Sequence, residues 1–272
     1  MFGLAALIIT IAVIVAIVIV VGTQTPHPLG ISIYTNQSTL LPEYRIFYSN
    51  ANSNSLLIDD QYSTPPRAYL SYYDHPEPFP RLILANNYSE ITSAASSPYV
   101  NDMTLAKKYN FSGNDYMGYD IEDWPLTPEI EQDNMAEYTQ LACNYVHNAG
   151  YKFAFTPQIN VPGWGQFAQV NWTCINLLGL QEQALSSNPH LLAKNVVQML
   201  AVSKAKNPKL VVFVQIDIAG DSTSATLPEL EADISHLSRI PGVNGIIIQD
   251  LCNSTGCNNE LGVLVNYTKQ IK

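Results

Sequence analysis

The chain has 272 residues, of which 47% are apolar, so it can bury a large core as one domain or as two small ones. Its formal net charge is −10, and its 13 Lys and Arg residues form no cluster. Because a protein that binds nucleic acid must neutralise phosphate charges, this composition excludes nucleic acid as a partner.

The first residues form a long apolar segment. From Phe2 to Gly22 every residue is apolar or small except Thr10, and about 20 such residues can cross a bilayer. The segment is longer than the apolar part of a signal peptide, no Lys or Arg precedes it, and no small-residue cleavage site follows it. We therefore expect residues 1–22 to form an uncleaved membrane helix. The alternative is a helix that packs against identical subunits in an extracellular filament, as in type IV pilin-like proteins.

Six Asn-x-Ser/Thr sequons indicate where the rest of the chain is located. They begin at Asn36, Asn87, Asn110, Asn171, Asn253 and Asn266. Asn in this motif is an acceptor for N-linked glycan, so we expect a glycosylated domain on the cell surface, outside the membrane. Asn-rich loops without glycan are the alternative interpretation.

The four cysteines fit an oxidising compartment. Cys252 and Cys257 lie five residues apart in a loop rich in Gly, Asn and Ser, a spacing that a small disulfide ring can close. Cys143 and Cys174 would then pair by elimination, although four cysteines allow three connectivities. A zinc site is the rival interpretation. No Cys-x-x-Cys occurs and only His147 lies near Cys143 in sequence, so we predict disulfides and no metal.

After a short Pro-containing tether at residues 23–30, one domain is expected over residues 31–272, with alternating strand and helix patterns. Apolar runs of strand length occur at Arg45–Ser49, Ala68–Tyr72, Leu82–Ala85, Tyr116–Ile121, Lys152–Thr156, Ile175–Leu180, Leu210–Ile216 and Asn244–Ile248. Helical patterns occur at Pro128–Asn148, Pro189–Lys206, Leu227–Leu237 and Glu260–Ile271. This alternation predicts an α/β fold, a closed (β/α)8 barrel of TIM-barrel type. An open α/β sheet is the alternative.

Acidic and amide side chains follow the predicted strands. In a (β/α)8 barrel the carboxyl ends of the strands meet at one mouth, where ligands bind. The residues expected there are Asp120, Glu122, Asp123, Gln158, Gln181, Glu182, Asp217 and Asp250, and the loops add Trp124 and Trp164. This combination favours carbohydrate as the ligand, because sugar faces stack on indole rings and sugar hydroxyls bond to carboxylates and amides.

Glycoside hydrolysis requires two carboxylates. Glu122 is our candidate for the general acid, with Asp217 or Glu182 as the partner carboxylate and Asp120 adjusting the proton affinity of Glu122. Strand alternation places Asp120 and Glu122 on the same side of their strand. Each candidate also has a structural interpretation: a helix N-terminus for Asp123, the next helix start for Glu182, loop solvation for Asp217, the adjacent disulfide loop for Asp250, and packing for Trp124 and Trp164.

Other reaction classes lack their residues in this sequence. Gly-x-Ser-x-Gly, His-Glu-x-x-His, the Walker A motif and Gly-x-Gly-x-x-Gly do not occur. The histidines lie away from the predicted strand ends, which leaves nucleophile–histidine catalysis without its partner. We expect no cofactor.

The stretch from Tyr119 to Gln132, YDIEDWPLTPEIEQ, resembles the strand-then-helix signature of a group of little-characterised glycoside-hydrolase-like TIM-barrel proteins. The run Asn176–Gln183 and the pair Asn207-Pro208 before a Val-rich strand also fit that pattern. The resemblance covers about residues 115–250. It implies a TIM-barrel fold and carries no settled reaction with it.

The same acidic tip is distantly similar to the D-G-x-D-x-D-x-E strand of family 18 chitinases. With Gly118 and Asp120 aligned, Glu122 falls on the last Asp of the motif and Trp124 on its Glu. That Glu is the acid that protonates the leaving group in the family. Its replacement by Trp124 means that the resemblance does not imply chitinase chemistry.

These features predict a membrane-anchored, extracellular, glycoside-hydrolase-like protein that acts on or binds cell-surface glycan. The sequence leaves open whether the acids hydrolyse the glycan or only hold it. The alternative is a structural surface protein. In that case residues 1–22 drive assembly into a pilus-like filament or layer, and a glycosylated, non-catalytic barrel lies outside.

Overall fold

The computed structural model describes residues 30–35, 44–49, 55–60, 81–92, 111–159, 162–218, 225–250, 263, 264 and 267. Several predicted features lie outside these residues: the apolar segment 2–22, the strand Ala68–Tyr72, Cys252, Cys257, and the sequons at Asn36, Asn110, Asn253 and Asn266. No helix within the described part is long and apolar enough to cross a membrane. The anchor at residues 1–22 therefore stays a prediction.

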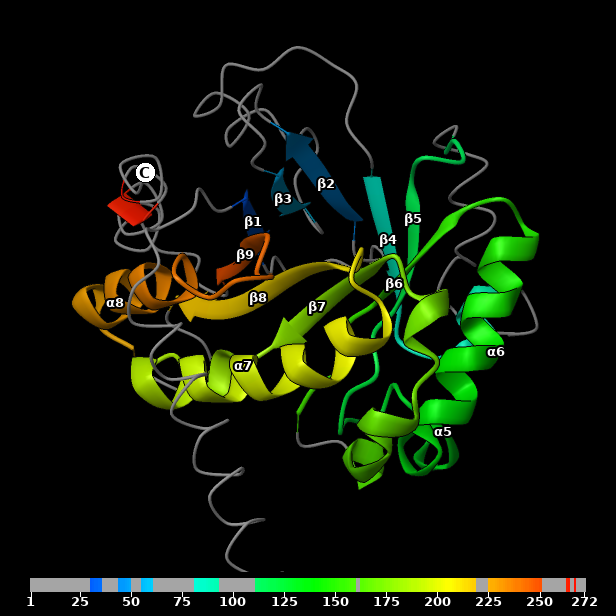
Figure 1. Cartoon of the computed structure of the whole chain (residues 1–272). Coiled ribbons are helices and arrows are strands. Elements are labelled where there is room, and N and C mark those ends of the chain that lie inside the picture. Colours follow the sequence, from blue (N-terminus) through cyan, green and yellow to red (C-terminus); the bar gives the residue numbers. More distant parts are fainter. Residues whose placement is uncertain are drawn as a thin grey trace, which may run out of the picture.

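The strands close into a barrel, which the helices flank (Figure 1). Around the barrel the order is β1 (Gly30–Thr35), β3 (Ser55–Asp60), β2 (Tyr44–Ser49), β4 (Arg81–Ala85), β5 (Tyr116–Tyr119), β6 (Lys152–Phe155), β7 (Leu177–Gln181), β8 (Val211–Ile218) and β9 (Gly245–Asp250). Every neighbouring pair from β4 to β9 is parallel, and β9 closes the barrel by pairing in parallel with β1. The carboxyl ends of these strands therefore face one mouth.

The first third of the barrel departs from the (β/α)8 prediction. β1 and β3 occur where the sequence patterns predict no strand, and β1 begins at Gly30, the last residue of the expected tether. β2 runs antiparallel to both β3 and β4. Only residues 50–54 join β2 to β3, whereas a parallel crossover needs a dozen or more residues, so the connection permits only an antiparallel return. The described part of the chain thus contributes nine barrel strands rather than eight.

Two of the predicted helices have the predicted bounds. They are α7 (Pro189–Lys206) and α8 (Leu227–Leu237), which lie side by side along β7 and β8 in Figure 1. The Asn188 side chain accepts a hydrogen bond from the first turn of α7, and Glu229 accepts two from Thr226 at the start of α8. Within the predicted helix Glu260–Ile271, the described positions 263, 264 and 267 are helical.

The predicted helix Pro128–Asn148 is divided into α5 (Glu129–Asp133) and α6 (Met135–Asn148). Gln166, in the 3-10 segment η1 (Pro162–Gln169), lies at the break. Its amide donates to the Asp133 carbonyl, and its side-chain oxygen accepts from the Ala136 backbone N–H. These bonds satisfy backbone groups that an interrupted helix leaves without partners. The break therefore depends on a contact from a distant segment, which the helical periodicity does not contain.

Apolar side chains fill the amino half of the barrel. They are Leu82, Leu84, Tyr116, Ala154, Leu177, Phe213 and Ile247. Glycine makes room for them, because a Cβ at Gly118 would lie 2.2 Å from Leu84 Cδ2 and one at Gly179 would lie 2.8 Å from Thr156 Cγ2. The alternate residues of the same strands, such as Met117, Phe153 and Leu180, belong to a larger core shared with the helices. Strands β5 to β9 are thus apolar on both faces, as parallel strands covered by helices must be.

Cys143 of α6 and Cys174 of the 3-10 turn η2 (Trp172–Cys174) form a disulfide, which confirms the prediction for this pair. The two Cα atoms are 6.3 Å apart, and 31 residues separate the cysteines in sequence. The described part of the chain has no free cysteine. The bond therefore joins the buried side of α6 to the segment that leads into β7.

Removal of this disulfide is expected to lower the free energy of unfolding by about 3–4 kcal/mol, because the unfolded chain regains the entropy of a 31-residue loop. Urea unfolding of the Cys143→Ala/Cys174→Ser variant measures the change. Asn144→Ser, at an exposed position of the same helix, is the control. A loss no larger than that of the control would show that the bond does not constrain the unfolded chain.

Candidate functional site

Polar side chains replace apolar ones toward the carboxyl ends of four neighbouring strands. Residues two apart in a strand share one face, so these polar residues occupy the next inward-facing positions after the apolar residues that fill the barrel. The register places Gln181 of β7 level with both Gln158 and Gln215. We call the resulting group the mouth cluster: Asp120, Thr156, Gln158, Gln181, Gln215 and Asp217. All of its members except Gln158 are buried.

Asp120 is held by two neighbouring strands of the mouth cluster. Its Oδ1 accepts a hydrogen bond from the Thr156 hydroxyl at 2.7 Å and one from the Gln181 side-chain amide at 2.5 Å. The same Gln181 amide also donates to the Thr156 carbonyl at 2.9 Å. Two donors on one carboxylate oxygen fix the direction of the Asp120 side chain. The sequence places these residues at one mouth, and the structure brings them into direct contact.

Gln158 connects the mouth cluster to the acidic tip that follows β5. Its backbone N–H donates to the Ile121 carbonyl at 2.9 Å, and its side-chain oxygen accepts from the Asp123 N–H at 2.9 Å. Gln183 donates to the side-chain oxygen of Gln181 at 3.0 Å. Gln158 and Gln181, the two glutamines that are predicted to bind substrate, therefore have side-chain amides that hydrogen bonds hold in one orientation.

Asp217 enters the mouth cluster from β8. It is 1% exposed, and its backbone N–H donates to the Ser186 hydroxyl at 3.1 Å. Asp250 is the last residue of β9 and is in register with Ile218, so its backbone lies at the same end of the barrel. The structure thus places Asp120 and Asp217 at the carboxyl ends of β5 and β8, at the mouth where the sequence predicts them.

Glu122 lies at the rim, beyond the mouth cluster. Ile121 before it is fully buried in the outer core, whereas the side chain of Asp120 contacts Thr156 and Gln181 inside the barrel. Glu122 is half-buried, and its backbone N–H donates to the Thr127 hydroxyl at 3.3 Å. The neighbouring Asp123 is exposed. Of the three acids in the tip, Asp120 is the deepest and Asp123 is the most solvated.

Thr127 organises the loop that carries Glu122 and Trp124, a role that the sequence analysis missed. Its hydroxyl accepts hydrogen bonds from the Glu122 N–H and the Trp124 indole N–H, and it donates to the Asn86 carbonyl at 2.8 Å. The Gln132 amide donates to the carbonyls of Trp124 and Thr127 at 3.1 and 2.7 Å. Thr127 and Gln132 of the signature therefore fix the backbone of the loop that carries Glu122 and Trp124.

Glu131 anchors the same loop to the outer face of β5. It is buried, and it accepts hydrogen bonds from the Tyr119 hydroxyl at 2.6 Å and the Tyr88 N–H at 2.8 Å. Burial raises the pKa of Glu131, against the effect of these two bonds, and nearby Glu90 raises it further. Burial and the adjacent Glu131 also raise the pKa of Tyr119. This acid supports the tip and lies on the opposite side of the strand from Asp120.

Glu182 is not brought together with Asp120. It follows Gln181, and it is an even number of residues from Leu178 and Leu180, whose side chains face the helices. Its polar neighbour is Asn195 of α7. It is fully buried, and neither carboxylate oxygen has a hydrogen-bond partner within 3.5 Å among the described residues. Burial raises the pKa of Glu182 to about 7, and Asn195 offsets only part of that effect.

Trp164 has a packing role in the structure. Its ring lies 4.6 Å from that of Phe167, which in turn lies 4.6 Å from Trp172. This aromatic group packs into the outer core beside α5 and α6. Contact between Trp164 and a ligand stays a prediction.

The two described sequons differ in how their Asn side chains are used. Asn171 is exposed, the Thr173 hydroxyl of its sequon donates to its side-chain oxygen at 2.6 Å, and its amide nitrogen donates one hydrogen bond, to Gln140 Oε1 at 2.7 Å. Asn87 is half-buried, and its amide nitrogen donates to Glu90 Oε1 at 2.8 Å and to the Leu126 carbonyl at 3.1 Å. N-glycosylation replaces one of the two amide hydrogens, so Asn171 can keep its one amide bond, whereas a glycan at Asn87 would break one of the two bonds that its amide makes to Glu90 and Leu126.

We therefore expect the folded, exported protein to carry glycan at Asn171 and to lack it at Asn87. Mass spectrometry of glycopeptides, before and after enzymatic release of N-glycans, measures the occupancy of each site. Asn171→Gln should remove the mass of one glycan, whereas Asn87→Gln should leave the glycan mass unchanged. Full occupancy at Asn87 would contradict this assignment.

Comparisons with known proteins add little to this geometry. No family model matches the chain, and no curated protein matches it. Among solved structures, the chain is similar to the crystal structure of chitinase from Chromobacterium violaceum ATCC 12472, with a TM-score of 0.49 and 10% sequence identity. That similarity covers 89% of this chain and 100% of the other. A likeness at this level carries no information on the reaction.

Proposed function

We propose that the barrel mouth binds glycan and that the domain is a glycoside-hydrolase-like protein. The observation that supports the proposal best is the environment of Asp120. A buried carboxylate, held by Thr156 and Gln181, lies at the carboxyl ends of parallel barrel strands. Ligands of (β/α)8 barrels bind at this end, and fixed carboxylates and amides are the groups that sugar hydroxyls bond to.

In the proposed reaction Glu122 donates a proton to the oxygen of the leaving sugar. Its half-buried position at the rim leaves it accessible from the mouth. Asp217 is the partner carboxylate, because it lies in the mouth cluster on β8, the third strand around the barrel from β5. Asp120 supports both by holding a negative charge in a fixed direction. We assign no catalytic step to Glu182, because its neighbour Asn195 lies on the helix side of β7.

Trp124 is the proposed platform for a sugar ring. Its indole N–H is occupied by Thr127, which fixes the plane of the ring relative to Glu122. A fixed, half-exposed aromatic face is suited to the apolar face of a sugar. In this proposal the residue that replaces the acid of the chitinase motif has become part of the binding surface.

The proposed setting is the outer surface of a cell, with residues 1–22 as the membrane anchor. The Cys143–Cys174 disulfide supports an oxidising compartment, and the exposed Asn171 sequon supports glycosylation there. The natural ligand would then be a glycan of the cell surface.

A hydrolysis assay on a panel of oligosaccharides tests the proposal. Glu122→Gln is expected to lower the turnover of any hydrolysed substrate by about 10²–10⁴-fold, because general acid catalysis contributes that much. Asp123→Asn is the matched control, since Asp123 is the adjacent, exposed acid whose backbone bond to Gln158 the substitution keeps. A wild-type protein that neither binds nor cleaves any glycan in the panel would contradict the proposal.

The alternative proposal is a structural surface protein, favoured by the 2–22 segment, whose only hydroxyl-bearing residue is Thr10. In that arrangement the helices of identical subunits pack into a filament or layer. Deletion of residues 1–22 separates the two proposals. An anchored glycan-binding protein should become a monomer that keeps its ligand, whereas a filament subunit should lose assembly.

A further inference from the structure

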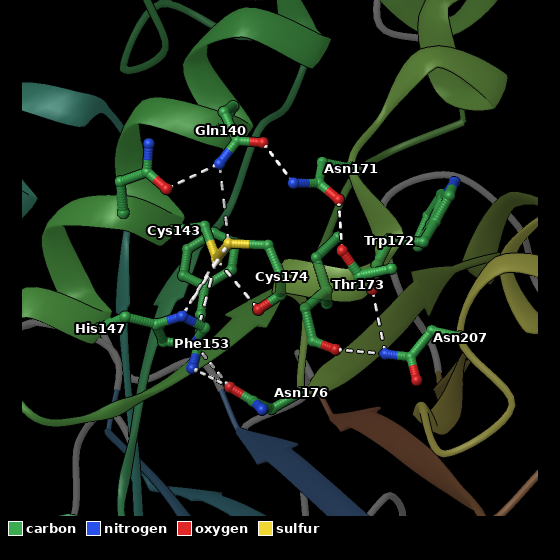
Figure 2. The surroundings of a disulfide bond; sticks show 12 residues. Gln140, Cys143, His147, Phe153, Asn171, Trp172, Thr173, Cys174, Asn176 and Asn207 are labelled. Atoms are coloured by element: carbon green, nitrogen blue, oxygen red, sulfur yellow. Dashed lines mark hydrogen bonds between the residues drawn. A yellow bond between two sulfur atoms is a disulfide. The ribbon is translucent and has the colours of Figure 1, made fainter.

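An exposed histidine of α6 lies against the disulfide (Figure 2). His147 is one helical turn after Cys143, and its Nδ1 lies 3.8 Å from Cys143 Sγ and 4.0 Å from Cys174 Sγ. The possible ligand atoms of these three residues all lie within 4.8 Å of one another. No other such group of His, Cys, Asp or Glu occurs within the described residues. The folded chain thus brings Cys174 next to Cys143 and His147, although 31 residues separate the two cysteines in sequence.

The hydrogen bonds around His147 direct its Nδ1 toward the sulfurs. Asn176 Oδ1 accepts a hydrogen bond from the Phe153 backbone N–H at 2.8 Å, which fixes this atom of Asn176 as the carbonyl oxygen. The same oxygen lies 2.9 Å from His147 Nε2, so Nε2 must carry the hydrogen and donate it. The lone pair of neutral imidazole is then on Nδ1. An outer partner that fixes the tautomer in this way accompanies most metal-bound histidines.

We propose that the reduced form of the protein binds Zn²⁺ through Cys143, Cys174 and Nδ1 of His147. A dithiol reductant opens the disulfide by exchange: the chain gains two thiols, and the reductant becomes the disulfide. Each thiol then loses its proton as its sulfur bonds to the ion, and neutral imidazole supplies the third ligand. Water completes the four-coordinate site, because His147 lies at the exposed end of the group.

The distances support this chemistry. Zinc–sulfur and zinc–nitrogen bonds of about 2.3 and 2.0–2.1 Å, at a tetrahedral angle, place sulfur and nitrogen about 3.6 Å apart. The two N···S separations in the disulfide form are already 3.8 and 4.0 Å. Only the sulfurs have to separate when the bond opens. The link between α6 and η2 would then persist in both oxidation states, as a disulfide outside the cell and as a metal bridge in a reducing compartment.

The test uses the full-length chain in detergent with Cys252→Ser and Cys257→Ser, so that Cys143 and Cys174 are the remaining cysteines. The chain is reduced with a phosphine, and zinc binding is measured by competition with a chromophoric chelator. We expect one Zn²⁺ per reduced chain and none per oxidised chain. His147→Ala in the same background should weaken binding by more than the roughly 100-fold that loss of an outer partner costs at most.

Circular dichroism of the reduced chain, with and without zinc, separates binding from folding. Zinc should raise the melting temperature of the reduced chain and should not raise that of the reduced His147→Ala chain. Equal zinc affinity in the two chains would overturn the proposal, because two thiols alone would then explain the binding. A reduced chain that binds no zinc, or that unfolds even in excess zinc, would also overturn it.

Discussion

Replacement of Asp120 by Ala is expected to lower the free energy of unfolding by about 2–4 kcal/mol, because each buried donor that loses its acceptor costs about 1–3 kcal/mol. The two donors are the Thr156 hydroxyl and the Gln181 amide. The Thr156 hydroxyl has the Tyr119 carbonyl at 3.4 Å as a poorer acceptor, which keeps the loss below the sum of two full penalties. Urea unfolding, followed by tryptophan fluorescence, measures the effect.

Two further variants separate the charge of Asp120 from its hydrogen bonds. Asp120→Asn can keep both bonds on its remaining oxygen, so it should lose much less stability than Asp120→Ala while losing glycan binding or hydrolysis. Asp123→Ala, at the exposed neighbouring acid, should change the free energy of unfolding by less than about 0.5 kcal/mol. If Asp120→Ala were as stable as Asp123→Ala, the mouth cluster would not be a fixed polar network.

The domain is expected to be more stable at pH 5 than at pH 8, because two fully buried carboxyls prefer their neutral form. Burial raises the pKa of Glu182 from 4.5 to about 7, and burial together with Glu229 raises the pKa of Asp233 on α8 from 3.8 to about 8. Among the described residues, no atom accepts from or donates to the oxygens of Asp233. As the pH rises past the unfolded pKa values, the unfolded chain ionises first, and stability falls until the folded pKa values are passed.

The expected loss is roughly several kcal/mol for the two groups together, at about 1.4 kcal/mol for each unit of pKa difference. Urea unfolding at pH 5, 6, 7 and 8 measures it for the wild type, Glu182→Gln and Asp233→Asn. In each variant the free energy of unfolding should fall less steeply with rising pH than in the wild type. The difference should extend up to about pH 7 for Glu182→Gln and up to about pH 8 for Asp233→Asn. Burial lowers the pKa of His236, so this residue makes the folded state less stable as the pH falls below the ordinary pKa of histidine, which is opposite to the effect of the two acids. The difference between each variant and the wild type removes this contribution and isolates the two acids. Curves that stay parallel would contradict the prediction.

Sequence patterns predicted the elements whose shape depends on local periodicity. The helices α7 and α8 follow from apolar spacing between clear start signals, and β4 to β9 follow from apolar runs. β1 and β3 have only short signals, the alternation Ile31-Ser32-Ile33 and the run Leu56-Leu57-Ile58, and their pairing with β9 and with each other completes them as strands. The division of α5 from α6 has the same origin, since it depends on the distant side chain of Gln166.

The candidate site could be predicted where strand alternation decides it. Asp120, Gln181 and Asp217 lie on the inner face because they continue the parity of Tyr116, Leu177 and Phe213. Glu182 shows the limit of that reasoning: a shift of one residue at a strand end moves a side chain to the other face. The role of Thr127 had a signal, the Thr-Pro pair before α5, but its partners Glu122, Trp124 and Asn86 come together only in the folded loop.

The most direct test of the proposed function is a crystal structure of the Glu122→Gln protein with the oligosaccharide that the panel selects. The proposal predicts a sugar ring in the mouth of the barrel, stacked on Trp124, with a glycosidic oxygen within hydrogen-bond distance of the side chain at position 122. A sugar bound elsewhere, with the mouth cluster covered by an identical subunit, would contradict the account. The structural surface protein would then be the better description of this chain.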